Sequence, residues 1–224
     1  MKTFKTLIII GALFMGEPIV SNAYALDVAR YKIHVDRKDR TVYVLNEKNK
    51  VVKSFPCGIG KGGLKRKTSM RDYVTPTGQF KVDIVLYNDS SYSQVSDEVV
   101  NRYKNGLYSE FFQDRKGLEK LFNNMNKIDF NRDGKPDNSY ENGYIGLDSA
   151  HAVTGPKMRN AWGIPYWYSI ALHGSAMTNI GKAKSGGCVH LPSSAVSALI
   201  EGGFAMVGTM VVISDVPPND VSKE

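Results

Sequence analysis

The chain has 224 residues, of which 42% are hydrophobic, and 29 Lys and Arg residues against 22 Asp and Glu residues give it a formal charge of +7. This length and composition suit one folded domain with a substantial core. No recognised nucleic-acid-binding motif accompanies the positive charge, so nucleic acid is not an expected partner, whereas an anionic setting such as a cell envelope is favoured.

Residues 1–25 have the pattern of a secretory signal peptide. Lys2 and Lys5 precede an apolar run, and Ala23 and Ala25 form a small-x-small cleavage site. The run has about ten apolar residues, too few to span a bilayer, which takes ~20. We therefore expect export to the periplasm or cell envelope, a mature chain from about residue 26, and no stable membrane span after cleavage.

Alternation of apolar and polar residues predicts antiparallel β-hairpins next in the chain. The expected strands are 30–36, 41–45 and 51–55, and a further strand runs from Phe80 to Leu86. A basic loop, GKGGLKRKTSMRD, separates the third strand from the fourth. We interpret this loop as solvated, and the alternative is that it binds anionic wall polymer or phospholipid headgroups.

A change in composition marks residues 87–140, which are rich in Asn, Asp, Ser and Lys. Helical spacing within this segment places a set of apolar side chains on one face: Leu118, Leu121, Phe122, Met125 and Ile128. We predict a largely helical insertion that packs on the β core and could also serve as a lid.

The end of the insertion has the layout of a calcium loop. Oxygen-bearing side chains occupy its positions one, three, five and nine, which are Asp129, Asn131, Asp133 and Asp137. Gly134 stands at position six, but the twelfth position is Tyr140 instead of glutamate. A structural calcium site and a plain Asx-rich turn are both compatible with this pattern.

The segment 170–192, IALHGSAMTNIGKAKSGGCVHLP, carries a histidine and a cysteine on backbone that must bend sharply. Alternation in WGIPYWYSIALH brings His173 out at the end of a strand, and glycines before Cys188 let a substrate approach the main chain. A thiolate nucleophile needs a base or cation, and His173 is the nearest candidate. The alternatives are a structural cysteine beside a core histidine, or a Cys57–Cys188 disulfide, which would silence the thiol.

After Cys188, Pro192 is expected to start a helix that runs through Ile200 and stops at two glycines. Residues 209–213 should form a closing strand, and residues 217–224 a tail.

Two motifs carry a family resemblance. Ser185-Gly186-Gly187-Cys188-Val189, preceded by His173-Gly174, resembles the catalytic signature of the L,D-transpeptidase family named after YkuD. Thr75-Pro76-Thr77-Gly78 resembles the family's second signature, a turn that opens a strand. The resemblance covers about residues 31–213. Two positions depart from the family pattern, since Gly186 stands where histidine is common and His190 where arginine or asparagine is usual.

The resemblance implies a mainly β (α+β), β-sandwich-like catalytic domain over residues 26–216, with the insertion at about 87–140. It also implies that Cys188 is the nucleophile, that His173 is the general base, and that the substrates are peptidoglycan stem peptides. The implied oxyanion or substrate-orienting residues are Ser185, Gly187, Gly174 and His190. No cofactor is expected for catalysis. The alternatives are an L,D-carboxypeptidase, which uses water as the acceptor, and a non-catalytic wall-binding or calcium-binding module.

Overall fold

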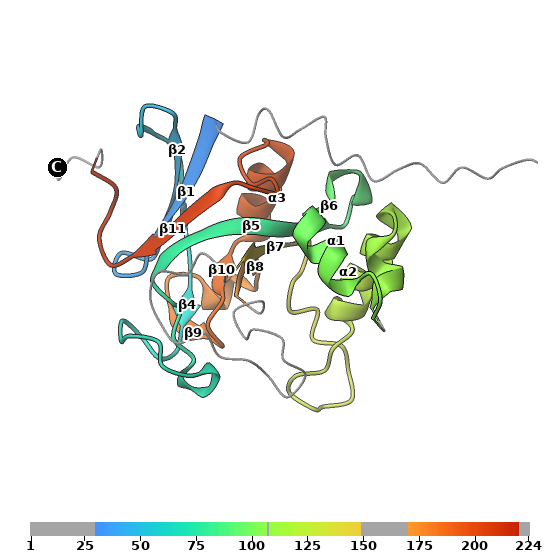
Figure 1. Ribbon diagram of the computed structural model, residues 1–224. Helices are drawn as coiled ribbons and strands as arrows, with labels where there is room; N and C mark the ends of the chain where they lie inside the picture. Colours follow the sequence, from blue (N-terminus) through green and yellow to red (C-terminus); the bar gives the residue numbers. More distant parts are fainter. Residues whose placement is uncertain (1–29, 107, 149–169, 220–224) are drawn as a thin grey trace, which may run out of the picture.

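The computed structural model describes residues 30–106, 108–148 and 170–219 (Figure 1). The predicted signal peptide, the start of the strand expected before His173, and residues 220–224 of the predicted tail lie outside this part. Within it, Pro218 is buried, so the tail does not leave the protein surface directly at residue 217.

A nine-stranded sheet forms the body of the described protein, in the order β10-β8-β7-β5-β11-β1-β2-β3 with β6 paired to β5, and β4 and β9 form a separate parallel pair. The strands are β1 (Tyr31–Asp36), β2 (Thr41–Asn46), β3 (Val51–Pro56), β4 (Ile59–Gly60), β5 (Gly78–Tyr87), β6 (Gln94–Val95), β7 (Gly143–Asp148), β8 (Ala171–Gly174), β9 (Ala183–Ser185), β10 (Val189–Leu191) and β11 (Met210–Ser214). The mainly β fold is thereby confirmed.

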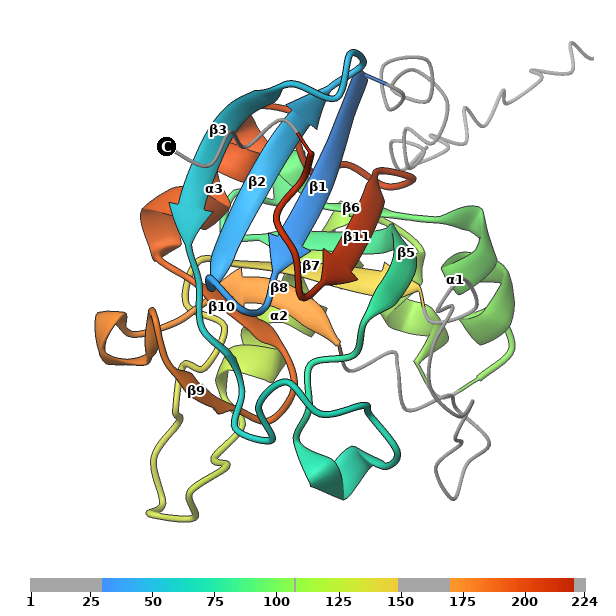
Figure 2. The same cartoon turned by 90° about the vertical axis from the view of Figure 1, so that its left-hand side faces the viewer.

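The N-terminal hairpins follow the alternation in the sequence. β1 pairs antiparallel with β2, β2 pairs antiparallel with β3, and β11 lies parallel to β1 on its other side (Figure 2). Ile33 and Val35 are fully buried, as are Val42 and Val44 opposite them. The buried apolar faces of β1 and β2 therefore fix the register of this pair, because a slip of one residue would expose them.

The central strand β7 was not predicted from the sequence. It lies between β5 and β8, and all six of its residues are buried. A strand that is covered on both faces has no alternation to detect, and GYIGLD includes two glycines that weaken the strand signal. The sequence of β7 therefore shows no alternation of apolar and polar residues that would predict a strand.

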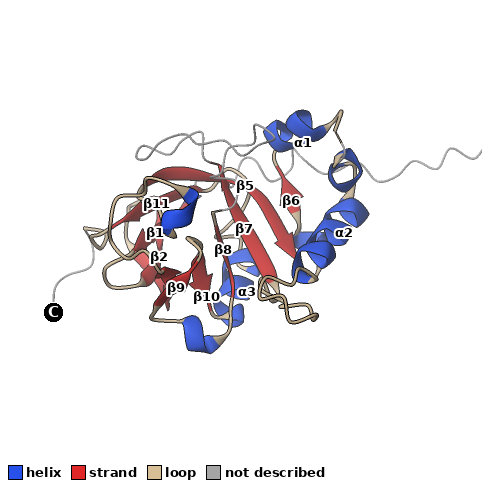
Figure 3. Ribbon diagram, turned by 90° about the horizontal axis from the view of Figure 1, so that it is seen from below, coloured by secondary structure: helices blue, strands red, loops and turns tan. Residues whose placement is uncertain are grey.

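Two apolar clusters cover the two faces of the sheet. The larger one joins the strands to α3 (Ser193–Glu201), the helix predicted after Pro192. The second joins β5, β7 and β8 to the insertion, with α1 (Asp97–Tyr103), α2 (Arg115–Asn126) and a 3-10 turn at Ser109–Phe112 (Figure 3). The segment predicted as an insertion thus contains two α-helices and packs on the sheet. None of the helices in the described ranges is long and apolar enough to cross a membrane.

The apolar face predicted for the insertion holds within α2. Leu118 and Phe122 are buried, and Leu121 and Met125 pack against them. Ile128 is 41% exposed because the helix has ended at Asn126 and its side chain no longer follows the helical face.

The two edges of the large sheet meet near the end of β3. Gly58 donates a backbone hydrogen bond to His190 O at 2.8 Å and accepts one from His190 N at 2.9 Å. This bridge joins the chain just after β3 to β10, so the sheet curls until it nearly closes. Its near-closure protects the backbone groups of β10, which would otherwise form an exposed edge.

The basic loop between β4 and β5 is only partly solvated. Lys65 and Arg66 are exposed, but Lys67 is 3% exposed, which corrects the expectation that the basic side chains of this loop face water. The loop is folded back by Arg37, whose guanidinium donates to the carbonyls of Thr75 at 2.6 Å, Leu64 at 3.2 Å and Lys65 at 3.3 Å. It also forms a bidentate ion pair with Asp215, both contacts being 2.7 Å.

We expect Arg37→Met to lower the free energy of unfolding by about 3 kcal/mol, because it leaves Asp215 and the buried Thr75 carbonyl without their partner. Urea denaturation measures this loss. Arg66→Met is the matched control on the same loop, and since Arg66 is exposed it should change stability by less than about 0.5 kcal/mol. Equal effects of the two variants would contradict the anchoring role of Arg37.

Candidate active site

The parallel pairing of β8 and β10 brings the two motif residues together. Leu172 lies opposite Val189, and His173 lies opposite His190. Cys188 immediately precedes β10, and its half-buried side chain packs against the second apolar cluster, to which the neighbouring Ala171 belongs. His173 and Cys188, fifteen positions apart in the sequence, thus lie on β8 and immediately before its neighbour β10.

His173 is 4% exposed and has aromatic rings on several sides. The rings of Tyr140 and His190 meet it edge-on at centroid distances of 5.0 Å and 4.8 Å, and Tyr144 stacks at 6.5 Å. Its Nδ1 lies 2.7 Å from the carbonyl oxygen of Gly174. A carbonyl can only accept, so Nδ1 carries the hydrogen, and in the neutral ring Nε2 keeps a lone pair that can accept a proton.

Gly174 and Gly187 are glycines for steric reasons. A Cβ atom on Gly174 would stand 2.9 Å from the Cβ of Glu141 and 3.0 Å from the carbonyl oxygen of Tyr140, so only glycine lets the end of the insertion pack here. Gly187 has a φ of +133°, a region that side chains strongly disfavour. The first glycine therefore brings Tyr140 onto His173, and the second allows the turn before Cys188.

Ser185 fixes this turn from inside. Its hydroxyl donates to the carbonyl of Cys188 at 2.6 Å and accepts from the amide of Gly187 at 3.0 Å. The Gly187 amide is thus already engaged in this conformation, and it would have to exchange that bond to hold an oxyanion. In this structure Ser185 holds the cysteine loop in shape.

His190, at the position that departs from the family pattern, lies against His173. Its Nδ1 is 3.2 Å from the hydroxyl of Ser175, which also accepts from Asn179 at 2.9 Å. The side chain is therefore oriented by the loop that follows β8.

Burial dominates the ionisation of the site. It raises the pKa of the Cys188 thiol to about 11, although the Ala171 backbone and the charge of Lys67 act in the opposite direction. Burial, followed by the neighbouring His190, lowers the pKa of His173 to about 3, while the backbone of Gly174 and Ser139 opposes that shift. Burial also lowers the pKa of His190 to about 4. At neutral pH the thiol and both imidazoles are therefore uncharged.

Two buried aspartates were not singled out from the sequence. Asp83 on β5 and Asp148 on β7 are 6% and 4% exposed. Burial, reinforced by the charge of Asp148, raises the pKa of Asp83 to about 7, and one Asp83 carboxylate oxygen has no hydrogen-bond partner in the described structure. Asp83 also influences Tyr144, which stacks on His173. No sequence signal distinguishes these residues from surface aspartates.

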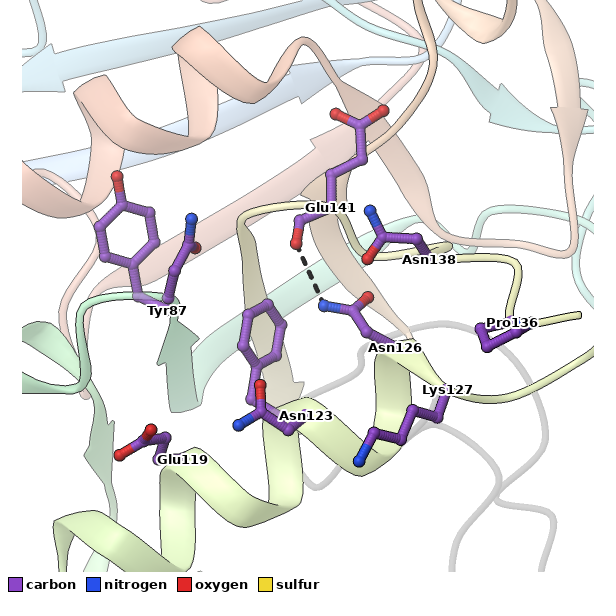
Figure 4. Close-up of a pocket in the computed structure, with 10 residues that line it drawn as sticks. Tyr87, Glu119, Asn123, Asn126, Lys127, Pro136, Asn138 and Glu141 are labelled. Atoms are coloured by element: carbon purple, nitrogen blue, oxygen red, sulfur yellow. Dashed lines mark hydrogen bonds between the residues drawn. The ribbon is translucent and has the colours of Figure 1, made fainter.

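A pocket of about 430 Å³ lies between α2 and the segment that leads to Tyr140 (Figure 4). Its lining is largely polar, and Asn126 donates to the carbonyl of Glu141 across it at 3.1 Å. Glu141 also hydrogen-bonds Ser193 and touches the Gly174 position. The pocket is therefore next to the candidate site, although neither Cys188 nor His173 lines it.

In the calcium-like segment, side-chain oxygens accept hydrogen bonds from the loop's own amides. Asp129 accepts from Arg132, Asp133 and Gly134, and Asp137 accepts from Phe130 and Asn131. In the described ranges no three His, Cys, Asp or Glu side chains gather closely enough to hold a metal ion. The calcium site stays a prediction.

No disulfide joins Cys57 and Cys188, both of which lie in the described part of the chain. Cys57 is fully buried in the larger apolar cluster, whereas Cys188 packs against the second one. Burial raises the pKa of Cys57 to about 12. Cys57 thus packs as a small apolar residue of the core.

Comparison with known families matches residues 30–213 to the YkuD family, the L,D-transpeptidase catalytic domain. The chain belongs to this family. The match spans the sheet, the insertion and both motifs, as the sequence resemblance implied. No curated protein matches the chain.

Several solved structures are similar to this L,D-transpeptidase domain at low identity. Bd1075 of Bdellovibrio bacteriovorus is 18% identical with a TM-score of 0.46, and the alignment covers 88% of this chain and 52% of that one. An L,D-transpeptidase from Mycobacterium smegmatis is 13% identical with a TM-score of 0.42, covering 83% and 59%. The catalytic domain of an E. faecium L,D-transpeptidase is 16% identical with a TM-score of 0.40, covering 83% and 98%. The chain thus spans little more than half of the first two.

We expect the rings of His173 and His190 to stay neutral from about pH 8 down to about pH 5, because their pKa values lie below the ordinary value of about 6.5. Long-range proton–nitrogen NMR spectra of nitrogen-15-labelled protein report both the charge and the tautomer. The unfolded chain takes up these protons near its ordinary pKa, so the contribution of the two histidines to stability is complete above about pH 6.5 and falls on acidification. Titration of His173 near the ordinary value would contradict its burial.

Proposed function

We propose that the protein is an exported peptidoglycan L,D-transpeptidase that forms a thioester between Cys188 and a peptide stem. The observation that carries this proposal is the parallel register of β8 and β10, which places His173 on β8 beside the strand that Cys188 immediately precedes. Export rests on the signal-peptide pattern of the sequence and on the location of the substrate in the cell envelope.

In the first half-reaction, Nε2 of His173 takes the thiol proton while Cys188 Sγ attacks the carbonyl carbon that joins a diamino acid to the terminal D-alanine. A carbon–sulfur bond forms and the carbon–nitrogen bond breaks. The proton passes from His173 to the departing amine, so D-alanine leaves as a neutral product and a thioester remains. In the second half, an amine of another stem attacks the thioester carbon and gives a proton to His173. A carbon–nitrogen bond forms, the carbon–sulfur bond breaks, and His173 returns the proton to the departing sulfur of Cys188.

The resting site is uncharged at neutral pH. Burial keeps the His173 ring unprotonated, so Nε2 has a lone pair for the thiol proton, and that proton transfer creates the two charges that the site must then stabilise. The Nδ1 bond to Gly174 O holds the ring in the tautomer that this role requires. Splitting one acyl transfer into two lower barriers is the gain from a covalent intermediate.

An L,D-carboxypeptidase is the second candidate function. It would use the same thioester with water in place of the amine, and the insertion is the feature that favours it. Tyr140 and the second apolar cluster cover one side of the site, which restricts the space for a bulky acceptor. A non-catalytic wall-binding module is the third possibility, and the preserved His173 and Cys188 argue against it.

The decisive assay is incubation with purified disaccharide-tetrapeptide followed by mass spectrometry. We expect Cys188→Ala to lower the rate at least roughly a thousandfold while the fold persists, because the thiol supplies the nucleophile and little packing. Cys57→Ala is the matched control, which should lose stability through its cavity but keep the reaction. Wild-type rates in Cys188→Ala would refute the assignment of the nucleophile.

The products separate the three functions. A cross-linked dimer identifies a transpeptidase, a tripeptide monomer identifies a carboxypeptidase, and unchanged substrate with a folded protein identifies a non-catalytic module.

The calcium loop is tested by thermal unfolding. If Asp129, Asn131, Asp133 and Asp137 bind the ion, calcium at a hundredfold above Kd should stabilise the protein by about 2.7 kcal/mol, because it binds only the folded state. Asp133→Asn should weaken this response, and Asp114→Asn at the N-cap of α2 serves as the control outside the loop. A melting temperature that is identical in calcium and in chelator would leave residues 129–137 as an Asx-rich turn.

A further inference from the structure

Lys67 is a buried cation in a loop that the sequence presents as a solvated basic surface. Its ammonium forms an ion pair with Asp72 at 2.9 Å and donates a hydrogen bond to the carbonyl of Val74 at 2.9 Å. The side chain of Lys67 is 2% exposed and that of Asp72 is 18% exposed. Burial of an ammonium costs desolvation free energy, which a lysine at the surface avoids. The buried position of Lys67 therefore needs a structural or functional explanation.

Asp72 is itself held firmly. Burial acts to raise its pKa, but hydrogen bonds from the amides of Ser69 and Val74, together with Lys67, outweigh burial and hold the pKa well below its ordinary range. The carboxylate is therefore charged throughout the working pH range, and it keeps the Lys67 ammonium in one place.

The ammonium lies beneath the turn that carries the candidate nucleophile. Its Nζ is 3.8 Å from the position that a Cβ atom on Gly187 would occupy, and the Val74 carbonyl oxygen that it binds is 3.2 Å from that position. Gly187 precedes Cys188 directly. Lys67, Val74 and the Gly187 turn are thus packed together, and any larger residue at position 187 would push them apart.

Four titratable groups near the thiol in the described structure are uncharged at neutral pH. Tyr140 and Tyr144 both interact with Cys188, and burial raises the pKa of each above the ordinary tyrosine value. His173 and His190, on the adjacent strands, have pKa values lowered to about 3 and 4. Lys67 acts on Cys188 in the direction that favours the thiolate. Among these groups Lys67 is the one whose positive charge can balance a thiolate.

We propose that Lys67 is a positioning residue of the thiol site, whose fixed ammonium stabilises the negative charge that Cys188 acquires when it loses its proton. The attraction between the ammonium and the thiolate is stronger beside the second apolar cluster than in water, because little solvent screens the two charges. This inference rests on the proposed function for its catalytic meaning, but thiol reactivity can be measured without any substrate.

The test measures the rate at which iodoacetamide alkylates Cys188 in the full chain, between about pH 7 and about pH 9.5, where the reactive species is the thiolate. Mass spectrometry of the Cys188 peptide separates its labelling from that of the buried Cys57. Lys67→Met should slow alkylation about tenfold at each pH, which corresponds to a pKa raised by about one unit. Lys65→Met, an exposed lysine two residues away, is the matched control and should change the rate less than about twofold.

Asp72→Asn separates charge from structure. It keeps an oxygen that can accept from Lys67 but removes the counter-charge, so alkylation should become faster. If both substitutions merely loosened the loop, Lys67→Met and Asp72→Asn would change the alkylation rate in the same direction. That result would overturn the proposal. If Lys67→Met does not fold, Asp72→Asn decides alone, because an unchanged or slower rate contradicts the role of charge.

The failure of this inference is distinguishable from the failure of the proposed function. A thiol whose reactivity depends on Lys67 in a protein that leaves the tetrapeptide unchanged refutes only the function. Turnover of the tetrapeptide by a protein whose thiol reactivity is the same in Lys67→Met and wild type refutes only the inference.

Discussion

The parallel pairing of β8 with β10 holds each residue of one strand beside a fixed residue of the other. This register determines where the side chains of the candidate site lie. His173 faces His190, and Cys188 enters the strand one residue before the Val189–Leu172 pair. The bridge between Gly58 and His190 ties β10 to the far end of the sheet, so β10 cannot drift from β8. The curled sheet therefore positions the residues of the candidate site as well as those of the core.

Two buried cations, Arg37 and Lys67, both hold the basic loop against the rest of the protein. Arg37 donates to the carbonyls of Leu64 and Lys65 within the loop and of Thr75 just after it, and it pairs with Asp215. Lys67 binds inside the loop and lies beneath the Gly187 turn. The Thr75 side chain of the second motif accepts from the Gly60 amide at 2.8 Å, which closes the base of the loop. The Thr-Pro-Thr-Gly turn is thus a structural support for the cysteine loop.

The insertion changes the electrostatics of the site because it removes water. Its apolar cluster packs on the sheet face that carries Cys188 and Ala171, and Tyr140 at its end lies on the His173 ring. Burial then raises the thiol pKa and lowers the imidazole pKa, so the pair rests in its uncharged form. A site of this kind depends on fixed charges and dipoles to stabilise the ions that form during reaction.

The sequence by itself determined the edge hairpins, the insertion with its helical face, the helix after Pro192 and the two candidate catalytic residues. Each of these has a local signal: alternation in β1 and β2, helical spacing in α2, and glycines beside Cys188. Only the tertiary structure decided that β7 is a central strand, that Asp83 and Asp148 are buried, and that Lys67 lies under the Gly187 turn. Partners distant in sequence decide whether a lysine or an aspartate is buried, as the Gly187 turn does for Lys67. A local sequence pattern contains no information about those partners.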